Sequence, residues 1–240
     1  MKVCCPLTQI TYQLKRSARR RTIGLKIAEL GLVVFAPSSL PQSSIDVCLL
    51  EKKSWILRHL QRRAAVVVID HLARGKLPFL GQELSLQVVD DECSAVTLEG
   101  QKLWVQLSRR IQQHNRQTHL EKMLTQFYQQ QAQHWFSERL HFWQQQLGVS
   151  ISTLLVKQWR RKWGSCDNKG VVSLNWRLLL APAWVADYVV VHELVHLRHM
   201  NHSASFWQLV AKTYPEYKSA EAYLRDHHHQ LFLTNVAQDQ

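Results

Sequence analysis

The sequence contains no run of about 18 or more uninterrupted apolar residues, the length that a helix needs to cross a bilayer. We therefore expect no transmembrane helix and no membrane partner. The start, Met1 to Pro6, lacks the apolar core of a secretory signal. The five cysteines are scattered without CxxC spacing, which argues against a disulfide framework and against a zinc ribbon. These absences predict a cytoplasmic protein.

Acidic residues are fewer than basic ones: 18 Asp and Glu stand against 30 Lys and Arg, a net charge of +12. Residues 1–110 hold 17 of the basic and 9 of the acidic residues. Such a charge attracts nucleic acid, anionic membranes or phosphorylated ligands, and it also serves solubility. Hydrophobic residues make up 46% of the chain and charged residues 20%, a globular composition that excludes a disordered or fibrous protein.

Apolar and polar residues alternate in much of the first 110 residues, which predicts strands. The alternating stretches are 10–14, 23–27, 84–88 and 103–107. A further strand is expected at 32–36, ended by Pro37, and residues 43–60 have helical spacing. Residues 112–147 contain neither Pro nor Gly and carry many aromatic residues, which predicts a long helix packed in the core. No internal repeat is visible, and no Pro-, Gly- or Ser-rich linker interrupts the chain.

These patterns predict an α+β fold in one compact unit. Its parts are a mostly antiparallel N-terminal β module (1–110), a long connecting helix (111–148) and a helical catalytic part with a small sheet (149–240). In the last part we expect strands at 152–158 and 171–180, a turn at 163–170 between them, and a helix opened by Pro182. An edge strand at 171–176 would hold an extended peptide by main-chain hydrogen bonds.

The helix after Pro182 carries the motif His192-Glu193-Leu194-Val195-His196. Histidines four residues apart lie on one helical face, so both imidazoles can bind one metal ion. Glu193 then lies where it can take a proton from a water activated by that ion, as the general base of a hydrolase.

A third histidine, His202, follows His196 by six residues. We expect Asn201 to end the helix in the left-handed conformation and Ser203 to cap the next helix, which would bring His202 over the other two. Three protein ligands leave a fourth position for water, as in a catalytic zinc site. The spacing alone does not distinguish zinc from nickel, copper or iron.

Other residues near the motif have weaker claims to a role. We interpret Tyr188 as a packing residue, Cys166 as part of a structural turn, and His199 as a residue facing solvent or supporting the ligands. His227, His228 and His229 are consecutive on a helix, so they point in different directions and cannot converge on one ion.

At this point the sequence resembles the YgjP-like metal-dependent hydrolases, also called the domain-of-unknown-function-45 group, which are related to minimal gluzincin-like and SprT-like metallopeptidases. The matching residues are Lys162-Trp163-Gly164-Ser165-Cys166, Leu174-Asn175-Trp176-Arg177-Leu178, Pro182, Asp187 to His196, Asn201-His202-Ser203, Phe206-Trp207, Arg19 to Ile23 and Trp55-Ile56. The resemblance implies a zincin-like catalytic part, zinc bound by His192, His196 and His202, a catalytic Glu193 and peptidase-type chemistry.

The sequence therefore predicts a zinc metallopeptidase that binds one Zn²⁺ per chain, with peptide or protein as its substrate. One alternative is a metal-dependent hydrolase of nucleotide phosphoanhydrides, because basic residues flank the same strands. These are Lys157, Arg160, Arg161, Lys162 and Arg177. A further alternative is a nucleic-acid-associated binding or scaffold protein with a vestigial metal site.

Overall fold

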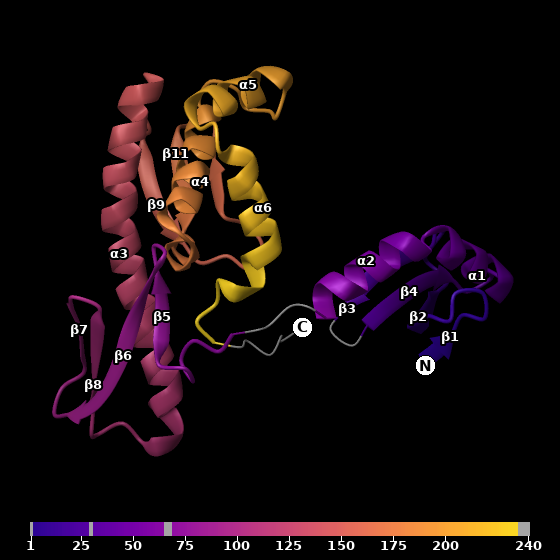
Figure 1. The fold of residues 1–240 in the computed structure, drawn as a ribbon, viewed down its shortest axis with the longest axis horizontal. Coiled ribbons are helices and arrows are strands. Elements are labelled where there is room, and N and C mark those ends of the chain that lie inside the picture. Colours follow the sequence, from indigo (N-terminus) through magenta and orange to yellow (C-terminus); the bar gives the residue numbers. More distant parts are fainter. Residues whose placement is uncertain (1, 29–30, 65–68, 235–240) are drawn as a thin grey trace. The chain divides into compact units, whose positions relative to one another are not determined.

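The computed structural model of the chain describes residues 2–28, 31–64 and 69–234. They belong to two compact units, Met1–Val67 and Val68–Gln240, and each unit has strands and helices (Figure 1). Three small sheets are each built from both antiparallel and parallel pairs, so the predicted α+β class is confirmed. Within the described ranges, no helix is both long enough and apolar enough to cross a membrane.

The first unit is a four-stranded sheet with two helices. Its elements are β1 (Lys2–Cys4), β2 (Thr11–Ser17), β3 (Gly24–Ala28), β4 (Gly31–Pro37), α1 (Gln42–Glu51) and α2 (Lys53–Ala64). The strand order is β1-β2-β4-β3, and β2 and β4 are parallel while the other two pairs are antiparallel. Its own core joins Leu32 and Val34 of β4 to Ile45 and Leu49 of α1 and to Ile56 of α2.

The second unit begins with another four-stranded sheet. It consists of β5 (Lys76–Phe79), β6 (Gln82–Asp91), β7 (Ala95–Glu99) and β8 (Lys102–Ser108) in the order β5-β6-β8-β7. The order and the pairing directions repeat those of the first sheet, a duplication that the sequence does not reveal. Leu77, Leu103 and Val105 of this sheet belong to the core of the second unit. The boundary that we expected near residue 110 therefore lies inside a compact unit, and the observed division falls at Val67.

The expected long helix is present as α3 (Arg116–Leu147), and it ends at Gly148, which adopts the left-handed conformation with φ +59°. Phe127, Tyr128 and Phe136 are buried in the core, as the aromatic pattern predicts. The Tyr128 hydroxyl donates a 2.7 Å hydrogen bond to the carbonyl of Pro78 in β5. Helix α3 is therefore joined to the β5–β8 sheet as well as to the elements that follow it.

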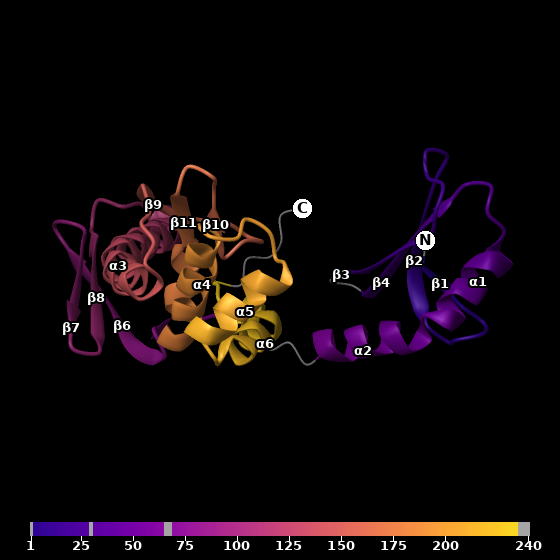
Figure 2. The same ribbon diagram turned by 90° about the horizontal axis from the view of Figure 1, so that it is seen from above.

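The remaining elements form the part of the unit that carries the histidine motif. They are β9 (Thr153–Lys157), β10 (Gly164–Cys166), β11 (Val171–Asn175), α4 (Ala183–Val195), α5 (Ala204–Thr213) and α6 (Tyr217–His227). Figures 1 and 2 show α4 beside α3, with α5 and α6 beyond it.

Two local predictions in this part are wrong. Residues 176–180 form a 3₁₀ helix instead of continuing the strand, because the Asn175 side chain accepts a hydrogen bond from the backbone N–H of Arg177 and caps that helix. Strand β11 lies between β10 and β9, so it is not an edge strand. The edge strands are β9 and β10, and β10 lies inside the segment 163–170 that we predicted to be a turn.

Candidate metal centre

The three predicted histidines come together at the C-terminal end of α4. His192 lies in the last turn of the helix and His196 at its C-cap. One ligand atom from each of His192, His196 and His202 lies within 4.8 Å of the others, and this is the one such group of three or more His, Cys, Asp or Glu in the described part of the chain. The Nε2 atoms of His192 and His202 are 3.0 Å apart.

The chain returns to His202 without a left-handed residue. The helix unwinds through a turn in which the N–H groups of Arg198 and His199 bond the carbonyl of Val195. Neither Asn201 nor its neighbours have a positive φ, so the predicted left-handed conformation at Asn201 is wrong. Ser203 does cap α5, since its hydroxyl accepts a hydrogen bond from the N–H of Phe206.

Helix α5 places an aromatic floor beneath the histidines. Phe206 is fully buried, and its ring centroid lies 5.0, 4.7 and 4.7 Å from those of His192, His196 and His202. The indole of Trp207 stacks on His202 at 5.8 Å. These contacts restrict the orientations of the imidazoles, so the aromatic residues of α5 serve the site as well as the core.

Hydrogen bonds fix the ring nitrogens that point away from the centre. The Nδ1 atom of His196 lies 3.1 Å from the carbonyl oxygen of His199, and because a carbonyl only accepts, Nδ1 carries the proton. The Tyr188 hydroxyl donates to Glu221 Oε1 at 3.2 Å and lies 3.3 Å from His192 Nδ1. With the tyrosine proton directed at the carboxylate, Nδ1–H of His192 donates to the tyrosine oxygen. In both histidines Nε2 then keeps its lone pair.

The same residues fit a divalent transition metal. Burial, followed by the neighbouring His196 and His202, lowers the pKa of His192 to about 4. Burial also lowers the pKa of His196, with the bond to His199 opposing it. The imidazoles of His192 and His196 are therefore neutral near pH 7, which is the form that binds metal. Three histidine nitrogens, with the other ring nitrogen of His192 and of His196 hydrogen-bonded, form a donor set suited to zinc and its neighbours.

Glu193 lies beside the histidines and is 4% exposed. Within the described part of the chain, its Oε2 is buried without a hydrogen-bond partner. Burial raises the pKa of Glu193 to about 8, while the nearby Lys162 ammonium opposes that rise. A buried carboxylate with one oxygen unpartnered is available to a water or a substrate group.

Glu193 packs directly against β10. A Cβ atom built on Gly164 would lie 2.5 Å from Glu193 Oε1, closer than real Cβ atoms approach another atom. The residue at this position of the strand therefore leaves space for the carboxylate because it has no side chain. This gives the Trp-Gly-Ser-Cys segment a physical reason for its glycine.

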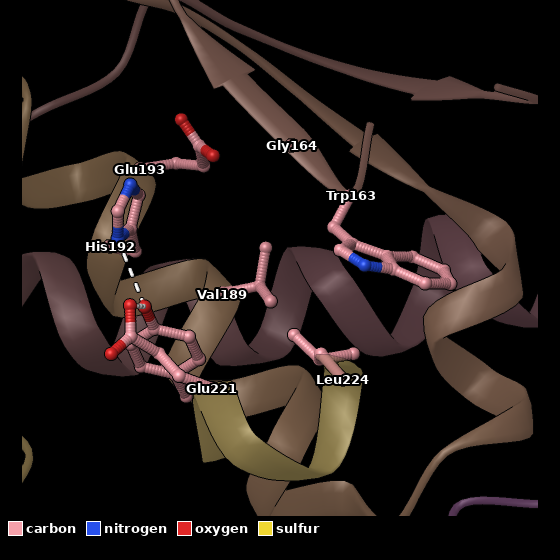
Figure 3. A pocket seen from close by; sticks show the side chains of 8 residues that line it. Trp163, Gly164, Val189, His192, Glu193, Glu221 and Leu224 are labelled. Carbon is pink, nitrogen blue, oxygen red and sulfur yellow. Dashed lines mark hydrogen bonds between the residues drawn. The ribbon is translucent and has the colours of Figure 1, made fainter. Parts of the chain in front are cut away.

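A cleft of about 300 Å³ opens between these elements (Figure 3). It is lined by Trp163, Gly164, Tyr188, Val189, His192, Glu193, Glu221 and Leu224. A second hollow of about 230 Å³ shares Trp163 and Leu224 with the first and is otherwise lined by Arg160, Arg161, Arg225 and His228. The cleft beside the histidines thus adjoins a basic depression.

Polar contacts hold the walls of the cleft in place. Asp187 accepts two hydrogen bonds from Arg139 at 2.6 and 3.0 Å and one from Trp143 Nε1 at 3.1 Å, which ties α4 to α3. The Asn175 side chain donates to the carbonyls of Trp159 and Lys162, both at 2.8 Å. These bonds fix the segment that leads into Trp163 and Gly164.

Cys166, His199, His227 and Tyr188 were also considered from the sequence, and the structure shows where each lies. Burial, with Glu193 and Asp167 nearby, raises the pKa of the Cys166 thiol to about 11, so it is protonated at neutral pH. His199 contributes its main-chain carbonyl to His196. His227 bonds the carbonyl of Tyr223 at 3.1 Å and stacks on its ring. Tyr188 has a polar role in addition to the packing role that we expected.

Two residues of the site, Glu221 and Gly164, are not predicted by the sequence. Glu221 lies on α6, and no spacing connects it with the motif, because only the packing of α6 on α4 brings it to Tyr188. Gly164 lies within a segment that we had recognised, but its contact with Glu193 depends on the position of β10 in the sheet.

Comparison with known proteins gives one extensive match. A family model described as "YgjP-like, metallopeptidase domain" matches residues 21–227. The crystal structure of the metallopeptidase zymogen of Pyrococcus abyssi abylysin is 25% identical over a region that covers 37% of this chain and 90% of that chain, with a TM-score of 0.35. No curated protein matches the chain. The structural similarity is too low to add to the family match.

Proposed function

Because this chain belongs to the YgjP-like family of metallopeptidase domains, we propose that it hydrolyses peptide bonds with one zinc ion held by His192, His196 and His202. The observation that carries the proposal is the convergence of three imidazoles beside a cleft that His192 and Glu193 line, with the outer nitrogens of His192 and His196 hydrogen-bonded to other groups. Membership of the family implies metal-dependent hydrolysis. That the metal is zinc and that these three histidines bind it are our proposals.

Glu193 is the proposed general base. A bound divalent ion supplies Lewis-acid chemistry, lowering the pKa of a water and polarising a carbonyl. Glu193 takes the proton of the attacking water on a carboxylate oxygen and passes it to the leaving amine. Its burial favours this role, since desolvation makes the carboxylate a stronger base than it is in water. Gly164 gives the carboxylate the space to lie in the cleft.

The edge strand β10 is the proposed docking strand for the substrate. Among the described strands it pairs with β11 alone, so the other side of Gly164–Cys166 has backbone groups that can bind an extended peptide. Gly164 also lines the cleft, so a peptide bound along β10 would pass close to Glu193. Because an extended chain is required, unfolded proteins and peptides are the proposed substrates.

A second candidate function is the hydrolysis of nucleotide phosphoanhydrides. The observation that favours it is the basic hollow with Arg160, Arg161 and Arg225, which adjoins the cleft and suits phosphate groups. The sites of both reactions would share the metal and Glu193, so only the substrate distinguishes them. For either function we propose a cytoplasmic location, which agrees with five free cysteines.

The deciding experiment compares wild type with Glu193→Gln and with Glu138→Gln, a matched change at an exposed glutamate on α3. Zinc-loaded proteins are assayed on unfolded casein and on nucleoside triphosphates. We expect casein cleavage by wild type and Glu138→Gln and a loss of at least about 10²-fold in Glu193→Gln. Glu193-dependent phosphate release without casein cleavage would establish the second candidate. Equal inactivity of all three on both substrates would favour a binding or scaffold protein.

Metal content tests the ligand set separately. His202→Ala should lower bound zinc after dialysis, measured by elemental analysis, because one of three nitrogen donors is lost. His199→Ala is the matched control: it removes another imidazole of the same loop but keeps the main-chain carbonyl that His196 uses. Full zinc occupancy in His202→Ala would remove His202 from the ligand set.

A further inference from the structure

The positive charge of the protein is concentrated in the first unit, which does not contain the metal centre. Residues 1–67 contain 12 of the 30 basic residues and 3 of the 18 acidic ones, so they carry +9 of the net charge of +12. The histidines, Glu193 and the cleft all belong to the second unit. The site already described therefore leaves this charge unexplained.

One face of the β1–β4 sheet packs on the helices of the first unit, and the other face does not. Tyr12, Leu32, Val34 and Ala36 belong to the apolar core that includes α1 and α2. Phe35 points to the opposite face because side chains alternate along a strand, and it lies outside that core. Among residues 2–28 and 31–64, the helices α1 and α2 lie on the same side of the sheet (Figure 2). Within the described part of the first unit, the face with Phe35 is therefore the one without a helix, and Val33 on that face is 7% exposed.

Basic side chains surround Phe35 on this face. The strand register places Lys15 of β2 on one side of Phe35 and Gly24 of β3 on the other. Lys26 stands beside Val33 in the neighbouring row of the same face. Lys15 and Lys26 are exposed, and Phe35 is half-buried. An aromatic ring with one lysine in its own row and another in the neighbouring row is an arrangement that solubility alone does not require.

An arginine completes the surface. The guanidinium of Arg20, from the β2–β3 connection, lies over the Phe35 ring with its carbon 4.8 Å from the centroid. A Cβ atom on Gly24 would lie 2.7 Å from Arg20 Nη1, so the glycine gives the guanidinium room to reach over the sheet. Arg19 and Arg21 are exposed on the same connection. We call Lys15, Arg20, Lys26 and Phe35, with Arg19 and Arg21, the basic sheet face.

We propose that the basic sheet face binds single-stranded nucleic acid. Lysine and arginine neutralise backbone phosphates, and an unpaired base stacks on Phe35 or on the guanidinium plane of Arg20. Base stacking on a sheet requires unpaired bases, which favours a single strand over a duplex. An anionic membrane is less suited to this face, because one aromatic ring among lysines offers little apolar area to insert.

The test uses the full chain and fluorescein-labelled oligonucleotides of about 20 nucleotides, oligo(dT), oligo(U) and a DNA duplex, with binding followed by fluorescence anisotropy. We expect both single strands to bind more tightly than the duplex. Phe35→Leu should weaken single-strand binding by roughly tenfold, the cost of one lost stacking contact. The double change Lys15→Gln and Lys26→Gln should reduce the slope of log K against log salt by about 1.4, because two phosphate contacts are lost.

Matched variants distinguish the effect of this surface on binding from the effect of the protein's total charge. Lys169→Gln with Lys212→Gln removes the same charge from exposed positions of the second unit and should change affinity less than about twofold. Glu193→Gln should bind as wild type does, because binding does not depend on the proposed hydrolysis. Circular dichroism verifies the folding of Phe35→Leu.

Three results would overturn the proposal. The first is equal weakening of binding by both pairs of lysine substitutions. The second is unchanged binding by folded Phe35→Leu together with an unchanged salt slope in the double variant Lys15→Gln and Lys26→Gln, and the third is binding to vesicles of phosphatidylserine and phosphatidylcholine without binding to any oligonucleotide.

Discussion

Gly164 and Glu193 are so close that a Cβ atom at position 164 would require the Glu193 side chain to move. A Cβ atom there would lie 2.5 Å from Glu193 Oε1, 2.7 Å from Cγ and 2.8 Å from Cδ. Gly164→Ala should therefore displace the carboxylate and reduce turnover by about 10²-fold, because small misplacements of a catalytic group are costly. Bound zinc should remain at the wild-type level.

Steady-state kinetics and elemental analysis check this first prediction. Ser165→Ala, on the same short strand, is the control and should keep most of the activity. Wild-type turnover by Gly164→Ala would show that the contact can relax without consequence.

Tyr188 and Glu221 should strengthen metal binding although neither is a proposed ligand. Tyr188→Phe keeps the ring but removes the hydroxyl that lies 3.3 Å from His192 Nδ1. Without that partner His192 loses its fixed orientation, and we expect zinc affinity to fall about 10- to 100-fold in competition with a chelator. Glu221→Gln should have a smaller effect in the same direction. Unchanged zinc affinity in Tyr188→Phe would show that the hydroxyl does not support metal binding.

Cys166 should be a poor nucleophile near neutral pH. Because burial and nearby carboxylates raise its thiol pKa to about 11, the thiolate form is scarce at pH 7 and increases as the pH rises toward that value. Iodoacetamide labelling followed by mass spectrometry should show Cys93, which is exposed, modified before Cys166 at pH 7. Cys166→Ser should retain peptidase activity. Fast labelling of Cys166 at pH 7 together with loss of activity in the serine variant would contradict this prediction.

The ion pair between Arg139 and Asp187 should contribute to stability, since it joins α3 to the helix that carries the motif. Asp187→Asn should lower the free energy of unfolding by about 1–3 kcal/mol, because hydrogen bonds to a charged group are lost in a partly buried place. Glu83→Gln breaks the exposed pair with Lys76 and should cost less than about 1 kcal/mol. Urea denaturation of both variants compares the two losses. Equal losses in the free energy of unfolding would be evidence against a special contribution of the Arg139–Asp187 pair.

The sequence predicted those features that depend on neighbouring residues along the chain. The alternation in residues 10–14, 23–27, 84–88 and 103–107 predicted strands, and the absence of Pro and Gly in residues 112–147 predicted α3. His192 and His196 are four residues apart on a helix, so their proximity follows from helical geometry alone. Ser203 was predicted as a cap from its hydroxyl and its position before an apolar helix.

Other features depend on contacts between distant segments, and only the tertiary structure decided them. Short strands do not specify their partners, so the sequence did not reveal that β10 is an edge strand or that β5–β8 share a core with α3. The contact of Glu221 with Tyr188 spans 33 residues and depends on how α6 packs on α4. Local periodicity fixes which side of an element is apolar, but the free energy of packing those sides against one another selects the neighbours, and that choice belongs to the whole chain.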